Sequence, residues 1–145
     1  MHIEINDQTT FREIQEAFSD FYPYLQLEFY TKPHQKYETS LDIDLVYPGK
    51  TVGDVKKTHV SGLLEIRPLD TIARVEKELK LRFGLSAQVF WNDKDVWCQT
   101  TGMDDFTLKE LNEMGRNSSD EFIISDYEEG MEENQSPWNV MQNDL

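Results

Sequence analysis

The chain is poor in the residues that several protein classes require. It holds one cysteine, so an internal disulfide is excluded. Its 7 glycines and 5 prolines in 145 residues exclude a collagen-like or low-complexity chain. No apolar run approaches the roughly 18 residues of a membrane-spanning helix. Residues 1–6 lack the basic start and apolar stretch of a secretory signal, so we expect a cytoplasmic protein without membrane contact.

Positive charge is also scarce. Lys and Arg number 14 against 28 Asp and Glu, which gives a formal net charge of −14. Eight of the acidic residues lie within residues 117–145, where there is no Lys or His and no Arg. A negative field repels phosphate backbones, so direct nucleic-acid binding is disfavoured. A protein partner with a basic or mixed surface is instead attracted to such a chain.

Apolar periodicity predicts an alternation of strands and helices. Strands are expected at about residues 2–6, 25–30, 41–45, 64–66, 87–91 and 96–101. Helices are expected at about 10–22, 51–59, 71–83 and 107–114. Capping boxes begin the first and last helices at Thr10 and Thr107, and Asp70 is the expected cap of the third. Gly84 and Gly115 are expected to end helices, and Leu45 is expected to face inward.

Two stretches of the chain match each other. When the first is shifted so that Ile3 falls on Leu64, the apolar positions of residues 3–22 coincide with those of residues 64–83, and one extra residue aligns the strands after them. We call this correspondence the internal match. Two strand–helix–strand units in series favour an α+β fold, an antiparallel sheet with helices mainly on one face, of ferredoxin-like (split βαβ) topology. We expect one domain over residues 1–127 and an acidic, disordered tail over residues 128–145.

A local resemblance suggests an alternative topology. The stretch LEIRPLDTIARV, residues 64–75, resembles the second strand and helix start of ubiquitin-like β-grasp proteins, and residues 88–91 and 105–108 resemble later segments of that fold. The last residues lack the diglycine of that family, so we expect no conjugation. The pattern Trp97, Thr100-Thr101, Asp104-Asp105 and Thr107-Leu108 is also similar to that of small bacterial α+β proteins of no assigned function, which implies no activity.

Residues with catalytic or metal-binding chemistry are dispersed. His2, His34 and His59 have no metal-ligand spacing, so no metal is expected. Cys98 has no histidine near it in sequence and is expected to be a buried core thiol rather than a nucleophile. The sequence therefore predicts no enzyme and no cofactor.

The hairpin at residues 87–101 carries the most informative pattern. A four-residue loop would pair Trp91 with Val96, Phe90 with Trp97 and Val89 with Cys98, so Phe90 and Trp97 would share one face. The out-of-phase residues of the other strands would extend that face as an aromatic and acidic binding surface made of Tyr30, Phe90, Trp97, Glu4, Glu28 and Glu65. Alternatively, the last helix or residues 122–124 pack over it.

These features favour a non-catalytic protein-interaction module that uses the aromatic and acidic sheet face, the acidic tail, or both. In the tail, Trp138 lies in an apolar segment, as in motifs that fold on binding. An alternative is an acidic nucleic-acid mimic that inhibits a DNA-binding protein. An enzyme is the third and least favoured alternative.

Overall fold

The computed structural model describes residues 1–32, 44–56 and 58–131. Its elements in chain order are β1 (His2–Asn6), α1 (Phe11–Phe21), β2 (Leu25–Tyr30), α2 (Val52–Val55), β3 (Ser61–Glu65), α3 (Ile72–Phe83), β4 (Ser86–Asp93), β5 (Val96–Gln99) and α4 (Leu108–Met131). The α+β class predicted from the sequence is confirmed.

The strands of the described residues form two antiparallel sheets. One consists of β1 and β3, and the other has the order β2-β4-β5. A ferredoxin-like fold would join its strands in a single sheet, so that finer prediction is not confirmed, and neither is the β-grasp alternative.

The core lies between the two sheets and the helices. Alternation places Ile5 and Leu64 on the buried face of the β1–β3 pair, and the opposite face is exposed. The helices α1 and α3 contribute one apolar stripe each, as their spacing predicted. The largest fully buried side chains are Phe11, Phe18, Phe29, Ile5, Ile14, Leu25, Leu27, Leu64, Ile66, Ile72, Leu79 and Leu108.

Two strand pairings join the halves of the chain, and in each of them one residue pairs with its equivalent in the internal match. Ile3 pairs with Leu64 in the β1–β3 ladder. Leu27 pairs with Val89 near the middle of the β2–β4 ladder. An antiparallel pairing in which equivalent residues face each other is what a two-fold relation between two halves requires. The first half comprises β1, α1, β2 and α2, and the second comprises β3, α3, β4, β5 and α4.

The helix starts repeat the same hydrogen bonds in both halves. Isolated bridges join Thr10 to Thr51 and Thr71 to Thr107, so the N-terminal caps of two helices lie side by side in each half. In the first half, Phe11 N–H donates to Lys50 O and Val52 N–H to Thr9 O; in the second, Ile72 N–H donates to Phe106 O and Leu108 N–H to Asp70 O. The match predicted from apolar spacing therefore extends to the backbone.

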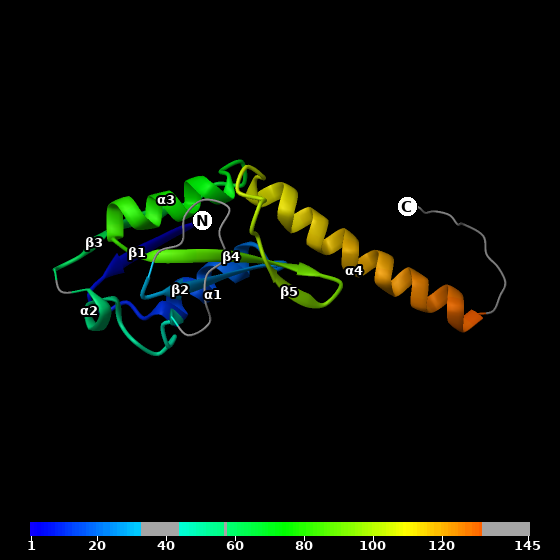
Figure 1. Cartoon of the computed structure of the whole chain (residues 1–145), viewed down its shortest axis with the longest axis horizontal. Helices are drawn as coiled ribbons and strands as arrows, with labels where there is room; N and C mark the ends of the chain where they lie inside the picture. The colour runs from blue at the N-terminus through cyan, green and yellow to red at the C-terminus, as the bar shows by residue number, and fades with distance from the viewer. Residues whose placement is uncertain (33–43, 57, 132–145) are drawn as a thin grey trace.

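The halves differ in their last helix. Helix α2 ends at Val55, and β3 begins soon after it at Ser61, whereas α4 runs to Met131. Figure 1 shows α4 extending away from the sheets, with the β4–β5 hairpin beside its first half. The prediction that this helix ends near Gly115 is wrong, and the helix crosses the boundary at residue 128 that was predicted for the tail.

Two further local predictions need correction. Thr71, not Asp70, caps α3, and the Asp70 carboxylate instead accepts from the backbone N–H of Arg67. Leu45 bridges to Tyr30 at the edge of β2, but its side chain is exposed and the neighbouring Val46 is buried instead. The rest of the strand predicted at residues 41–45 lies mostly outside the described residues.

Candidate functional site

The β4–β5 hairpin brings Phe90 and Trp97 to the same face by a register that differs from the predicted one. Asp93 pairs with Val96 and Asn92 with Trp97, two residues away from the predicted pairing. The turn has only two residues, Lys94 and Asp95, and both have positive φ, 52° and 72°. Because side chains alternate with a period of two, a shift of two residues preserves the face. Phe90 and Trp97 are diagonal neighbours across the two strands, within reach of aromatic side chains.

The tip of this hairpin is exposed on one side and partly covered on the other. Val96 is 60% exposed and Trp97 is 41% exposed, although consecutive strand residues point to opposite faces. Helix α4 contacts the hairpin beside its turn: the Ser118 hydroxyl accepts from Lys94 N–H at 2.8 Å, and Gly115 lies against the carbonyl of Asn92. The expected covering by the last helix is therefore present near Asn92 and leaves much of Trp97 accessible.

Glu28 lies on the same face as Phe90 and Trp97. It pairs with Gln88 on β4, two residues from Phe90, and its side chain is half-buried. Gln15 of α1 donates to the Glu28 carboxylate at 3.0 Å. Burial raises the pKa of Glu28, and the hydrogen bond from Gln15 opposes this rise. Three predicted site residues, Phe90, Trp97 and Glu28, thus share one face of this sheet, but only Phe90 and Trp97 are neighbours, since Glu28 lies two strands away from Trp97.

The sequence predicted that Tyr30 lies on the uncovered sheet face, but the structure buries it. It is 4% exposed and lines a cavity together with residues of α2 and α3. Alternation gives the direction of a strand side chain but not what covers it, so the exposure of Tyr30 was predicted wrongly.

The remaining predicted residues lie elsewhere. Glu4 and Glu65 are exposed on the β1–β3 pair, which is a different sheet from the one that carries Phe90 and Trp97. Trp138 lies outside the described residues. The continuous aromatic and acidic face expected from a single sheet is therefore divided between two sheets.

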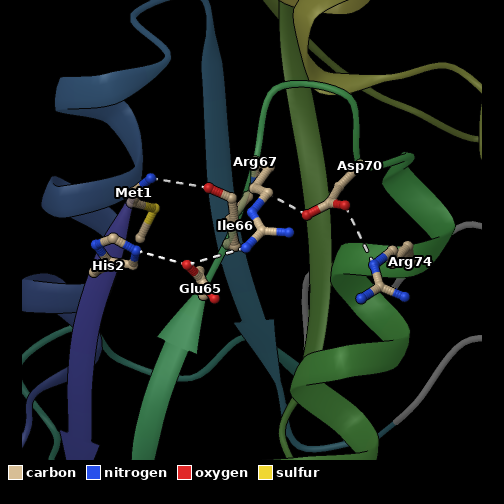
Figure 2. Close-up of polar contacts among 7 residues, drawn as sticks. All are labelled: Met1, His2, Glu65, Ile66, Arg67, Asp70 and Arg74. Carbon is tan, nitrogen blue, oxygen red and sulfur yellow. Dashed lines mark hydrogen bonds and ion pairs between the residues drawn. The ribbon is translucent and has the colours of Figure 1, made fainter.

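Glu65 is the centre of a polar cluster at the end of the β1–β3 pair (Figure 2). Its carboxylate lies 2.8 Å from Nε2 of His2 and 3.4 Å from a guanidinium nitrogen of Arg67. The hydrogen bond with His2, and to a lesser extent the charge of Arg67, lowers the pKa of Glu65. All three side chains are exposed, so these pairs contribute little to stability.

The same cluster anchors the segment that leads from β3 to α3. The amino group of Met1 donates to the carbonyl of Ile66 at 2.9 Å. Asp70 accepts from the backbone N–H of Arg67 at 2.9 Å and lies 3.2 Å from Nε of Arg74. Figure 2 shows these contacts in sequence from β1 to α3. Because each group in this series has a partner, we assign the cluster a role in holding the segment.

A second exposed pair links the loop after β1 to the start of β3. The Asp7 carboxylate is hydrogen-bonded to Nδ1 of His59 and accepts from Val60 N–H at 2.9 Å. The hydrogen bond to His59 lowers the pKa of Asp7, with a smaller contribution from the Val60 N–H. The same bond to Asp7 raises the pKa of His59. This pair has no equivalent in the second half, where Pro68 stands at the position that matches Asp7.

Cys98 differs from the expected core thiol, since it is half-buried and its Sγ lies 3.7 Å from the carbonyl of Val96. Within residues 1–32, 44–56 and 58–131, no group of three or more His, Cys, Asp or Glu side chains is arranged to hold a metal ion.

Sequence reasoning missed one feature, the cavity that Tyr30 lines. It has a volume of about 290 Å³ and includes Lys56 and Lys80 in its wall. These lysines are far apart in sequence and belong to no motif. The internal match offers one signal, because it aligns the start of the short helix α2 with the start of the long helix α4.

Comparison with known proteins found no matching family model, no matching curated protein and no matching solved structure. In the part of the chain that the structure describes, no helix combines the length and the apolar composition needed to cross a membrane.

Proposed function

We propose that this protein is a non-catalytic protein-interaction module whose binding surface is the tip of the β4–β5 hairpin. The observation that carries the proposal is the exposure of Val96 and Trp97 on opposite sides of the same strand. Large apolar side chains on a rigid, uncovered element are frequent anchors of protein interfaces, and tryptophan is enriched among the residues that dominate binding energy.

The chemistry around the tip favours a basic segment of a partner protein. Asp93 and Asp95 lie at the turn on either side of Lys94, and Glu28 lies farther away on the same sheet face as Trp97. The whole chain has a net charge of −14, which attracts a cationic partner over long distances. An Arg or Lys side chain of the partner would stack on the Trp97 ring by a cation–π contact while the nearby carboxylates balance its charge.

Selection of peptides from a random displayed library against the full-length protein tests this proposal. We expect the selected peptides to be rich in Arg and Lys. In solution, Trp97→Ala should weaken their binding by about tenfold or more, as for a central interface tryptophan. Raising the salt concentration should weaken it further, because the attraction between charges is screened.

Leu81→Ala is the matched control, since Leu81 is 71% exposed on α3, away from the hairpin. It should leave the affinity unchanged. Circular dichroism of both variants checks that the fold is intact. Selected peptides without basic residues, or an affinity that Trp97→Ala leaves unchanged, would refute the proposal.

A further inference from the structure

The cavity beside Tyr30 lies where the first half ends after the short helix α2, and we call this position the open end. Its apolar wall is formed by Phe29 of β2, Val46, Val55 of α2 and Leu85. Its polar wall is formed by Lys56, Lys80 and Ser86. The volume, about 290 Å³, is close to the lower end of the range for small-molecule sites, roughly 300 Å³ upward.

In the second half, a helix stands where the first half has this cavity. The internal match of the strands makes Tyr30 equivalent to Asn92, and Ser86 equivalent to Tyr24. Asn92 and Tyr24 are contacted by Gly115 of α4, so closely that an added Cβ would lie 2.7 Å from Cβ of Tyr24. Because α2 ends at Val55, no corresponding turn of helix reaches Tyr30 and Ser86 among the described residues. The cavity is therefore the position that α4 fills in the other half.

Lys56 occupies the position equivalent to Asn112, because Thr51 and Thr107 are equivalent caps at the starts of α2 and α4. Asn112 accepts from the backbone N–H of Tyr24 at 2.9 Å, a short and fully formed hydrogen bond. Lys56 Nζ instead reaches the carbonyl of Gly84 at 3.4 Å, which is long for a charged donor. The exchange of an amide for a lysine places a cation at the open end.

Lys80 places a second cation in the same wall. Its Nζ lies 3.5 Å from the hydroxyl of Ser86, again a weak contact with a neutral group. Neither Lys56 nor Lys80 forms an ion pair with a described residue. The described residues of the wall include no carboxylate, although acidic residues outnumber basic ones two to one in the chain. Two ammonium groups that both lack a carboxylate partner among these residues are suited to a ligand of negative charge.

From the apolar wall and the two ammonium groups together, we infer that this cavity binds a small organic anion, a carboxylate with a short apolar body. The apolar body packs against Val46, Val55 and Leu85, and the carboxylate accepts hydrogen bonds from Lys56, Lys80 and the Ser86 hydroxyl. The inference is independent of the hairpin surface, because none of these residues belongs to β5 or to the turn.

The test is a titration of the isotope-labelled full-length protein, followed by the backbone amide NMR signals, with three probes used separately: hexanoate, hexan-1-ol and inorganic phosphate. Hexanoate should shift the amide signals of Gly84 and Ser86 in a saturable way. Hexan-1-ol lacks the charge and phosphate lacks the apolar body, so each should bind at least about tenfold more weakly.

Lys56→Gln combined with Lys80→Gln should weaken hexanoate binding by about tenfold or more. Lys77→Gln is the matched control, because Lys77 is exposed on the same helix as Lys80 and does not line the cavity. It changes the net charge by one unit and should leave binding unchanged. Both variants alter exposed or half-buried side chains, and thermal unfolding checks that they fold.

Absence of saturable hexanoate binding would overturn the inference, as would equal binding of hexan-1-ol or an affinity that the double variant retains. Binding that Lys77→Gln weakens as much as the double variant would show general attraction to charge and would also refute a specific site.

Discussion

The two halves of this protein share a framework and end differently. Both begin their helices with paired threonine caps, and each meets the other half through strand pairs in which equivalent residues face each other. In the second half, α4 continues and packs Gly115 against Tyr24 and Asn92. In the first half, α2 stops after one turn and leaves a cavity with two lysines in its wall. The shared framework fixes the core, while the length of one helix decides whether an end is closed or open.

The largest expected effect comes from the core that the halves build together. Phe18 and Leu79 are equivalent residues, and both are 0% exposed. Phe18→Ala should lower the free energy of unfolding by about 4 kcal/mol and Leu79→Ala by about 3 kcal/mol, from lost burial and the cavity left behind. Urea unfolding followed by circular dichroism and by tryptophan fluorescence measures both. Because each half pairs its strands with the other, the transition should remain single. Two separate transitions would mean that the halves unfold independently.

The next effect tests the closed end. A Cβ at position 115 would lie 2.7 Å from Cβ of Tyr24 and 3.0 Å from the carbonyl oxygen of Asn92. Gly115→Val should therefore destabilise the protein by about 2–3 kcal/mol in thermal or urea unfolding, despite the better helix propensity of valine. Asn117→Val is the control, since Asn117 is exposed on the same helix. If both variants had the same stability, the close packing of α4 would be disproved.

A smaller effect on stability is expected from a helix-to-strand hydrogen bond that differs between the halves, made by Gln15 in the first and Glu76 in the second. Gln15 of α1 donates to the carbonyl of Leu27 at 2.8 Å, whereas its equivalent Glu76 of α3 accepts from Val89 N–H at 3.0 Å. Gln15→Glu should cost about 2 kcal/mol, because a carboxylate would face a carbonyl oxygen and the nearby Glu28.

Glu76→Gln is the matched variant for this comparison. Its amide oxygen can still accept from Val89 N–H, so the loss should stay below about 1 kcal/mol. Chemical denaturation of both proteins under the same conditions gives the difference. The reverse order of the two losses would contradict the assignment of donor and acceptor.

Helix capping gives an effect of about 1 kcal/mol. Thr10 forms a capping box in which its side chain accepts from Glu13 N–H and the Glu13 carboxylate accepts from Thr10 N–H. Its equivalent Thr71 only accepts from Arg74 N–H. Thr10→Ala should cost about 1 kcal/mol and Thr71→Ala somewhat less, because only the first cap is reciprocal. Thermal unfolding of the two variants compares them, and a larger loss for Thr71→Ala would count against this account.

The smallest effect is the pH dependence that the Asp7–His59 pair adds to the first half alone. The pKa of His59 is raised from 6.5, so its contribution to stability is full below that value and is lost as pH rises through the higher folded-state pKa. The pKa of Asp7 is lowered from 3.8, so its contribution is present above that value and is lost as pH falls through the folded-state pKa.

His59→Ala tests this pH dependence by melting experiments. The difference in melting temperature between wild type and variant should be present at about pH 5 and should be smaller at about pH 8, because the contribution of His59 is lost as pH rises through its raised pKa. A difference that stays constant between these two pH values would exclude the pair as its source.

Features encoded over a few residues could be predicted from the sequence. The Thr10 and Thr107 capping boxes, the end of α3 at Gly84 and the apolar stripes of the helices depend on contacts within one or two turns. The faces of Phe90, Trp97 and Glu28 followed from strand alternation alone. For the same reason, the equivalence of the halves was visible in the apolar spacing.

Features that depend on a partner distant in sequence were predicted wrongly or missed. Gly115 was interpreted as a helix end, but glycine is there because α4 approaches Tyr24 and Asn92 closely. The two-residue turn places Lys94 and Asp95 at positive φ. The Ser118 hydroxyl of α4 accepts from Lys94 N–H, and the Asn92 side chain accepts from Asp95 N–H. The burial of Tyr30 and the cavity between Lys56 and Lys80 required residues from α2, β2 and α3 to meet.

By itself the sequence determined the order of the helices and strands in the described residues, which side of each is apolar, and that the chain consists of two matching units with a strong negative charge. Only the tertiary structure decided that the strands divide into two sheets, that one end is closed by a helix, and that the other keeps a cavity. The physical reason is range: periodicity and caps act over a few residues, whereas covering a surface depends on which distant segment packs against it.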